Sequence, residues 1–240
     1  MKNKRLGDII ERLDLHFGSA VRTGKKKKNL VDVLIATKLS QNTTDKTSHK
    51  AFVNLKNRYK NWDEIAAAPL RDLAKEIKVC GMADTKSRDI KMMLNGMKKN
   101  YGKISLEHLR KKKDEEVYEE LLNYKGIGTK TIACLLAFGM ERPAFPVDTH
   151  VHRILNRMGI VDTKTPEQTF TAAKDIVPDK DKVGFHVNLI KFGRSICRAA
   201  SPLCGECPVY ELCGFRDKKV FKEKPVTKVK ENNFIILENI

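Results

Sequence analysis

The stretch LLNYKGIGTKTIA, residues 121–133, decides the fold. Gly126 and Gly128 enclose Ile127 in a tight turn, and the apolar residues on both sides recur at helical spacing, which predicts helix, hairpin, helix. Ile127 is expected to point inward and to pin the turn. The backbone N–H groups of the hairpin and the positive end of the second helix together form a seat for a phosphate group.

Lys130 lies in the first turn of that second helix, where the helix dipole disfavours a cation. The dipole favours loss of the proton, and a neutral amine is a nucleophile that could attack a sugar carbon beside the phosphate seat. Such an attack needs a carboxylate to stabilise positive charge on the sugar, and Asp148, in FPVDTHVHR, follows 18 residues later. Each residue also has a simpler interpretation: Lys130 as a surface contact to phosphate, and Asp148 as a helix N-cap, a role it could combine with catalysis.

The composition is that of a basic globular protein. Of 240 residues, 47 are Lys or Arg and 30 are Asp or Glu, for a net charge of +17, and 41% are hydrophobic. This charge favours nucleic acid as a partner, although a lysine-rich proteome would give a similar balance. No apolar run is long enough for a membrane span, and no secretion signal is evident, so we expect an intracellular protein with reduced cysteines.

Most of the chain predicts helices, because apolar residues recur at helical spacing between glycines and prolines. An all-α fold is therefore expected. In NWDEIAAAP, Asp63 is the expected N-cap of one helix. Further helices are expected over residues 30–39, 47–59, 151–158, 166–176 and 187–192.

Four cysteines, Cys197, Cys204, Cys207 and Cys213, follow the spacing C-x6-C-x2-C-x5-C. Thiolates are the ligands that zinc and iron–sulfur clusters prefer, so these residues predict one metal centre. Only Cys204 and Cys207 form the C-x2-C knuckle of structural zinc sites, which favours an iron–sulfur cluster but leaves zinc open.

GIGTKT, PVDTH and the four-cysteine loop together resemble the endonuclease III branch of the helix-hairpin-helix (HhH-GPD) DNA glycosylases, over roughly residues 30–213. The resemblance implies two helical lobes. One is a six-helix barrel over residues 29–140, with the helix-hairpin-helix motif at 120–138. The other combines residues 1–28 with 141–217 and holds a 4Fe-4S cluster, while 218–240 form a tail without an assigned role. Bent DNA would bind between the lobes with its damaged base flipped out.

The resemblance makes Lys130 the Schiff-base lysine, Asp148 the catalytic aspartate and the four cysteines the cluster ligands, and it places His150 near the pocket. A polar plug, either Gln41 or Asn42 in LSQNTTD, and an apolar wedge, Met82 in CGMADTKS, would fill the gap left by the flipped base. Met82 could instead be a core methionine. The hairpin residues expected to contact DNA are Gly126, Ile127, Gly128 and Thr129.

Two departures from the family pattern concern the hairpin and the plug. Tyr124 and Lys125 stand where the family often has Leu-Pro, so the Tyr124 side chain could change packing at the hairpin entry, and Lys125 is expected to add a phosphate contact. SQNTTD replaces the commoner SAQATD, which leaves the plug residue ambiguous. Both departures bear on substrate preference more than on the type of reaction.

The resemblance implies a base excision repair glycosylase with abasic-site (AP) lyase activity. It would remove damaged, oxidised pyrimidines from duplex DNA through a lysine Schiff base and beta-elimination. We expect a monomer that acts on double-stranded DNA containing damaged bases or abasic sites, away from membranes. Two alternatives stay open. One is a monofunctional glycosylase for mispaired thymine, uracil or adenine, although such branches commonly lack the lysine. The other is a non-catalytic iron–sulfur DNA-binding protein, in which Lys130 and Asp148 would be dispensable.

Overall fold

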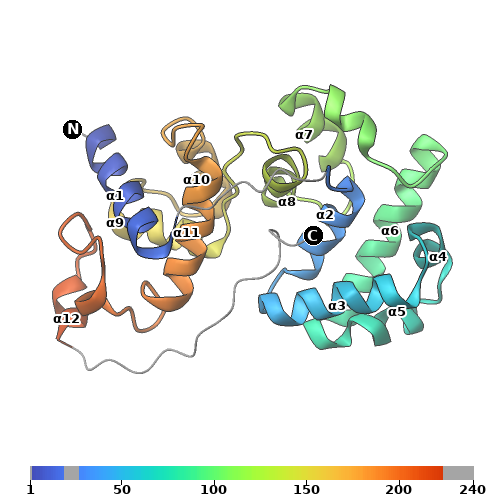
Figure 1. The fold of residues 1–240 in the computed structure, drawn as a ribbon, viewed down its shortest axis with the longest axis horizontal. Helices are drawn as coiled ribbons and strands as arrows, with labels where there is room; N and C mark the ends of the chain where they lie inside the picture. The colour runs from blue at the N-terminus through green and yellow to red at the C-terminus, as the bar shows by residue number, and fades with distance from the viewer. Residues whose placement is uncertain (1, 19–26, 224–240) are drawn as a thin grey trace. The chain divides into compact units, whose positions relative to one another are not determined.

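The computed structural model describes residues 2–18 and 27–223, and every regular element in these ranges is a helix, which confirms the expected all-α fold. None of the helices in these ranges is long and apolar enough to cross a membrane. The chain divides into two compact units (Figure 1). In the described residues, the central unit comprises 27–142, and the terminal unit comprises 2–18 and 143–223. Most of the expected tail, 224–240, lies outside the described residues.

The central unit consists of α-helices with short 3₁₀ and π segments between or after them. Its elements are α2 (Leu30–Leu39), α3 (Asp45–Arg58), α4 (Trp62–Ala67), α5 (Leu70–Ile77), the 3₁₀ turn η1 (Lys78–Cys80), α6 (Ala83–Tyr101), the 3₁₀ turn η2 (Glu107–Lys111), α7 (Asp114–Leu122), α8 (Thr129–Cys134) and the π-helical turn η3 (Leu135–Gly139).

Helix α2 forms the centre of this unit. Its sequence is apolar on nearly every side, and every residue except Asp32 is buried, as expected for a helix packed all round. α3, α6 and α8 pack against it (Figure 1). Asp32 accepts hydrogen bonds from the Trp62 indole at 2.8 Å and from the Lys56 ammonium at 3.2 Å, which joins α2 to α3 and α4.

Glu120 connects α7 to the end of α6 and to η2. Its carboxylate accepts from Tyr101 and Lys112 and contacts His108 Nε2 at 2.6 Å. Burial would raise the pKa of Glu120, but the hydrogen bonds from Lys112, Tyr101 and His108 outweigh it and lower the pKa to about 2. The group is therefore ionised at neutral pH and holds three segments together.

The expected N-cap at Asp63 is wrong. Asn61 caps α4, and its side chain accepts from Glu64 N at 2.9 Å. The helix begins at Trp62 because Asn61 is extended and the Trp62 ring is anchored to Asp32, so Asp63 lies inside the first turn.

The terminal unit contains α1 (Lys2–Phe17), α9 (Thr149–Met158), α10 (Pro166–Ala173), α11 (Lys182–Ser195), the 3₁₀ turn η4 (Cys204–Glu206) and α12 (Lys218–Lys222). α1 and α9 both pack against α11. The apolar face of α1 contributes four fully or almost fully buried residues to the core of this unit: Leu6, Ile9, Ile10 and Leu13. The expected helix over 166–176 ends at Ala173, and the one over 187–192 is longer at both ends.

Candidate functional site

The hairpin between α7 and α8 has the local geometry that its sequence predicts. Gly126 has φ +87°, a conformation that favours glycine, and Ile127 is 5% exposed, so it does point inward. Ile127 N–H donates to Tyr124 O at 3.1 Å and closes the turn. Gly128 is the N-cap of α8 and has no side chain to cap it, which leaves the first-turn N–H groups available to an anion.

Thr129 and Lys130 are the first and second residues of α8, and both are half-buried. The expected position of Lys130 in the first helical turn is confirmed. The amine is therefore carried by the helix that begins directly at the hairpin, and α8 is fixed in turn by its contacts with α2 and α7. This arrangement sets a cationic or nucleophilic group beside a candidate phosphate seat.

Asp148 is the N-cap of α9 in the terminal unit. Its Oδ1 accepts from His150 N at 2.8 Å and from Val151 N at 2.9 Å, so the capping interpretation is confirmed. The cap uses only Oδ1, and Oδ2 takes no part in it. Lys130 belongs to the central unit and Asp148 to the terminal unit, so their pairing stays a prediction.

His150 lies in the first turn of α9, within reach of Arg153 Nη2 at 3.2 Å from its Nδ1. Burial lowers the pKa of His150; Asp148 opposes that shift, whereas Arg153 and Arg194 add to it. The ring is therefore neutral at pH 7 and can exchange hydrogen bonds as donor and acceptor. Gly193 of α11 leaves room for it, since a Cβ there would lie 2.8 Å from His150 Nδ1.

The structure separates the two candidate plug residues. Gln41 is half-buried, and its Nε2 donates to Thr131 Oγ1 of α8 at 3.4 Å. Asn42 is exposed, and its Nδ2 lies 3.9 Å from the sulfur of Met82. Met82 is 55% exposed, so its interpretation as a core methionine is wrong. Asn42 and Met82 come together at the surface of the central unit, whereas Gln41 is turned toward α8.

Sequence reasoning missed a buried ion pair below the hairpin. Lys38 Nζ lies 2.7 Å from Asp89 Oδ2 and donates to Gly126 O at 3.4 Å, and the Lys38 side chain is only 8% exposed. The signal was available in the sequence, because a lysine inside the apolar stretch LVDVLIATKL needs a carboxylate partner if that stretch is buried.

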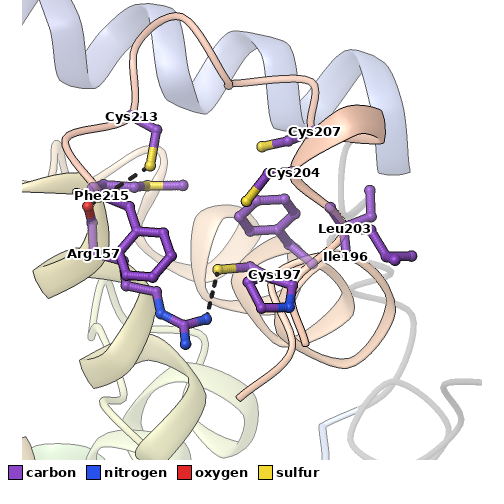
Figure 2. A pocket seen from close by; sticks show the side chains of 11 residues that line it. Arg157, Ile196, Cys197, Leu203, Cys204, Cys207, Cys213 and Phe215 are labelled. Atoms are coloured by element: carbon purple, nitrogen blue, oxygen red, sulfur yellow. Dashed lines mark hydrogen bonds between the residues drawn. The ribbon is translucent and has the colours of Figure 1, made fainter. Parts of the chain in front are cut away.

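The four cysteines of the expected metal centre line one pocket in the terminal unit. Figure 2 shows their sulfur atoms turned toward the same space. Within the described part of the chain, no three His, Cys, Asp or Glu side chains form a group that could hold a metal ion. The metal centre therefore stays a prediction. The remaining lining is apolar apart from Arg157, whose Nη1 lies 3.6 Å from Cys197 Sγ.

The chemistry of this pocket fits an anionic sulfur-ligated group. Burial raises the pKa of Cys207 to about 12 and also raises the pKa values of Cys197 and Cys204. A metal centre held by Cys197, Cys204 and Cys207 would therefore have to displace their protons. Arg157, which contacts Cys197 Sγ, would supply a compensating positive charge to such a group.

Comparison with known proteins identifies the family of this chain. Residues 35–179 match the family model of the HhH-GPD superfamily base excision DNA repair proteins. Endonuclease III of Thermotoga maritima is 36% identical over 207 residues, which cover 86% of this chain and 93% of that protein.

Two solved structures are similar in sequence and fold. A non-covalent endonuclease III–DNA complex matches with a TM-score of 0.78 at 26% identity, covering 93% of this chain and all of that one. A trapped covalent endonuclease III–DNA intermediate matches with a TM-score of 0.76 at 26% identity, covering 92% of this chain and 98% of that one. The chain therefore belongs to the HhH-GPD superfamily of base excision DNA repair proteins and is an endonuclease III-like DNA glycosylase.

Proposed function

We propose that this protein is a bifunctional glycosylase and AP lyase that removes oxidised pyrimidines from duplex DNA and acts as a monomer. The Lys130 amine attacks C1′ of the damaged nucleotide, the base leaves, and the resulting Schiff base allows beta-elimination of the 3′ phosphate. Asp148 stabilises the positive charge that develops on the sugar and helps to deprotonate the amine. No diffusible cofactor is consumed.

The position of Lys130 carries this proposal. Lys130 lies in the first turn of α8, next to a hairpin whose N–H groups can hold a DNA phosphate. A phosphate held there would place the adjoining sugar within reach of the Lys130 amine. The trapped covalent complex of a similar endonuclease III supports a covalent step. Asp148 supports it further, because its capping bonds hold the carboxylate in one orientation while Oδ2 takes no part in the cap.

Asn42 and Met82 are proposed as the plug and the wedge. Met82 is an exposed apolar side chain on a tight turn, the kind of group that enters between base steps and kinks DNA. Asn42 touches it and can hydrogen-bond the base left without a partner. The Gln41 amide already has a partner in Thr131, so we assign it to supporting α8.

Cys197, Cys204, Cys207 and Cys213 would hold a 4Fe-4S cluster. Such a cluster would cross-link the loop after α11, which otherwise contains only the short η4 turn. Iron and sulfide content of the purified protein, about four of each per chain against one zinc, distinguishes the cluster from a zinc site.

Borohydride trapping tests the covalent step. The protein is incubated with a duplex containing either thymine glycol or an abasic site, and borohydride reduces any Schiff base to a stable amine. Lys130→Gln is compared with Lys125→Gln, which removes the same charge from an exposed residue on the same hairpin. We expect wild type and Lys125→Gln to give the adduct and Lys130→Gln to give none.

Three results would count against the proposal. An adduct that persists in Lys130→Gln would place the nucleophile elsewhere. Release of the base without any adduct would indicate a monofunctional glycosylase. DNA binding with neither event would indicate a non-catalytic protein.

A further inference from the structure

Two exposed turns of the central unit share an uncommon backbone conformation. Asn42, between α2 and α3, has φ 52°, and Met82, between η1 and α6, has φ 51°. Asparagine tolerates this conformation, but a methionine keeps it only where the surrounding structure imposes it. The Asn42 amide and the Met82 sulfur are 3.9 Å apart, so the tips of the two turns touch.

A buried amine joins the bases of the same two turns. Lys86 of α6 is 2% exposed, and its Nζ donates to Leu39 O and to Cys80 O, both at 2.9 Å. Leu39 is the last residue of α2 and Cys80 is the last residue of η1, so each acceptor directly precedes one turn. Cys80 Sγ lies 3.6 Å from the same nitrogen.

The contacts of Lys86 resist movement of either turn. Carbonyl groups at the end of a helix lack partners within it and carry partial negative charge, which suits an ammonium donor. Burial lowers the pKa of Lys86, and Cys80 opposes that shift. Sliding one turn past the other would leave a buried donor without its acceptor, which is costly in an interior.

We infer that Lys86 is a positioning residue for base extrusion, which holds the two turns in one register so that Asn42 and Met82 enter the duplex as a single wedge. The inference rests on the proposed function. Because Asn42 and Met82 are already held together, no binding free energy is lost in ordering them when the base is flipped.

The test compares one chemical step on two forms of DNA. An abasic site in a duplex must be extruded before Lys130 can reach it, whereas an abasic site in a single strand needs no extrusion. Lys86→Met removes the ammonium and keeps most of the stem. Its matched control is Lys91→Met, on the same helix, where Nζ donates to Ala67 O and Ala68 O at the end of α4 and joins neither turn.

We expect Lys86→Met to lower the rate of Schiff-base trapping on the duplex by about tenfold and to leave the rate on the single strand unchanged. Lys91→Met should change neither rate. A 2-aminopurine placed beside the abasic site should brighten when wild type binds, and less so with Lys86→Met. In a Met82→Ala background the Lys86 substitution should have little further effect on the duplex, because the wedge is already lost.

Equal losses on both forms of DNA, or no loss on the duplex, would overturn the role of Lys86. Failure of the wild type to trap either form would instead count against the proposed function, and the 2-aminopurine signal would then decide on Lys86 alone. If Lys86→Met does not fold, Lys86→Gln, which keeps an N–H donor, is measured in its place. Failure of both to fold would assign Lys86 to folding and would also overturn the inference.

Discussion

The buried ion pair between Lys38 and Asp89 should contribute strongly to the stability of the central unit. Asp89→Ala removes the carboxylate that lies 2.7 Å from Lys38 Nζ, where the two side chains are 15% and 8% exposed. Breaking a buried pair from one side costs about 3–5 kcal/mol, because the remaining charge is left without compensation. Gly126 O still accepts from Lys38, and Asp89 is partly exposed, so we expect the lower end, about 3 kcal/mol. For a chain of this size, that loss lowers Tm by roughly 6–12 °C.

The matched control is a pair of the same length at the surface. Lys98 Nζ also lies 2.7 Å from Asp63 Oδ1, but both side chains are more than half exposed. Asp63→Ala should cost no more than about 1 kcal/mol, because exposed pairs are screened by water. Urea unfolding is followed by the fluorescence of Trp62, the single tryptophan of the chain, which is buried in the central unit and so reports on that unit.

A second replacement separates charge from packing. Lys38→Met in the Asp89→Ala background removes the uncompensated ammonium and should restore more than half of the lost stability. Equal costs for Asp89→Ala and Asp63→Ala would refute the argument that burial makes the inner pair strong. A double variant less stable than Asp89→Ala would show that Lys38 contributes mainly through its contact with Gly126.

Three further perturbations follow from individual contacts. Because the pKa of Glu120 is lowered from 4.5 to about 2, its ionised form contributes about 3 kcal/mol to stability above pH 4.5, and this contribution is lost as the pH falls toward 2. In Glu120→Gln the urea midpoint should therefore vary less over that pH interval. Gly96→Ala places a Cβ 2.9 Å from the Tyr124 ring and should destabilise by about 1–2 kcal/mol in thermal unfolding, whereas in a Tyr124→Leu background the same change should be neutral or stabilising. Gly193→Ala should displace His150, because the new Cβ would lie 2.8 Å from His150 Nδ1. We expect a lower yield of trapped adduct and unchanged DNA binding when both are measured on the same abasic duplex.

Local structure could be predicted wherever a short-range rule decides it. The apolar run over 30–39 predicted the bounds of α2, the Gly-Ile-Gly turn predicted the inward side chain of Ile127, and the capping role of Asp148 followed from its place before a helix. In each case the deciding interactions lie within a few residues of one another.

The rest depends on contacts between distant segments. Nothing near Asp63 indicates that Trp62 is anchored to Asp32, and so the cap was assigned two residues too late. Gln41 and Asn42 are adjacent residues with the same amide group, so the sequence does not show which one is the plug. Only their contacts distinguish them, since Gln41 bonds to Thr131 of α8 and Asn42 lies beside Met82 before α6. The pairing of Lys130 with Asp148 and the metal centre of the cysteines stay predictions.

The order of the helices along the chain also has a consequence for biosynthesis. α1 ends at Phe17, and its packing partner α11 begins at Lys182. Roughly 160 residues are therefore translated between them, including the described part of the central unit, 27–142. At ribosomal speeds of about 5–20 residues per second, the apolar face of α1 stays without its packing partner α11 for on the order of 10–30 s. Residues 27–142 of the central unit are complete by then and can fold first. A nascent chain stalled before α11 should therefore carry a folded central unit and an amphipathic helix accessible to chaperones.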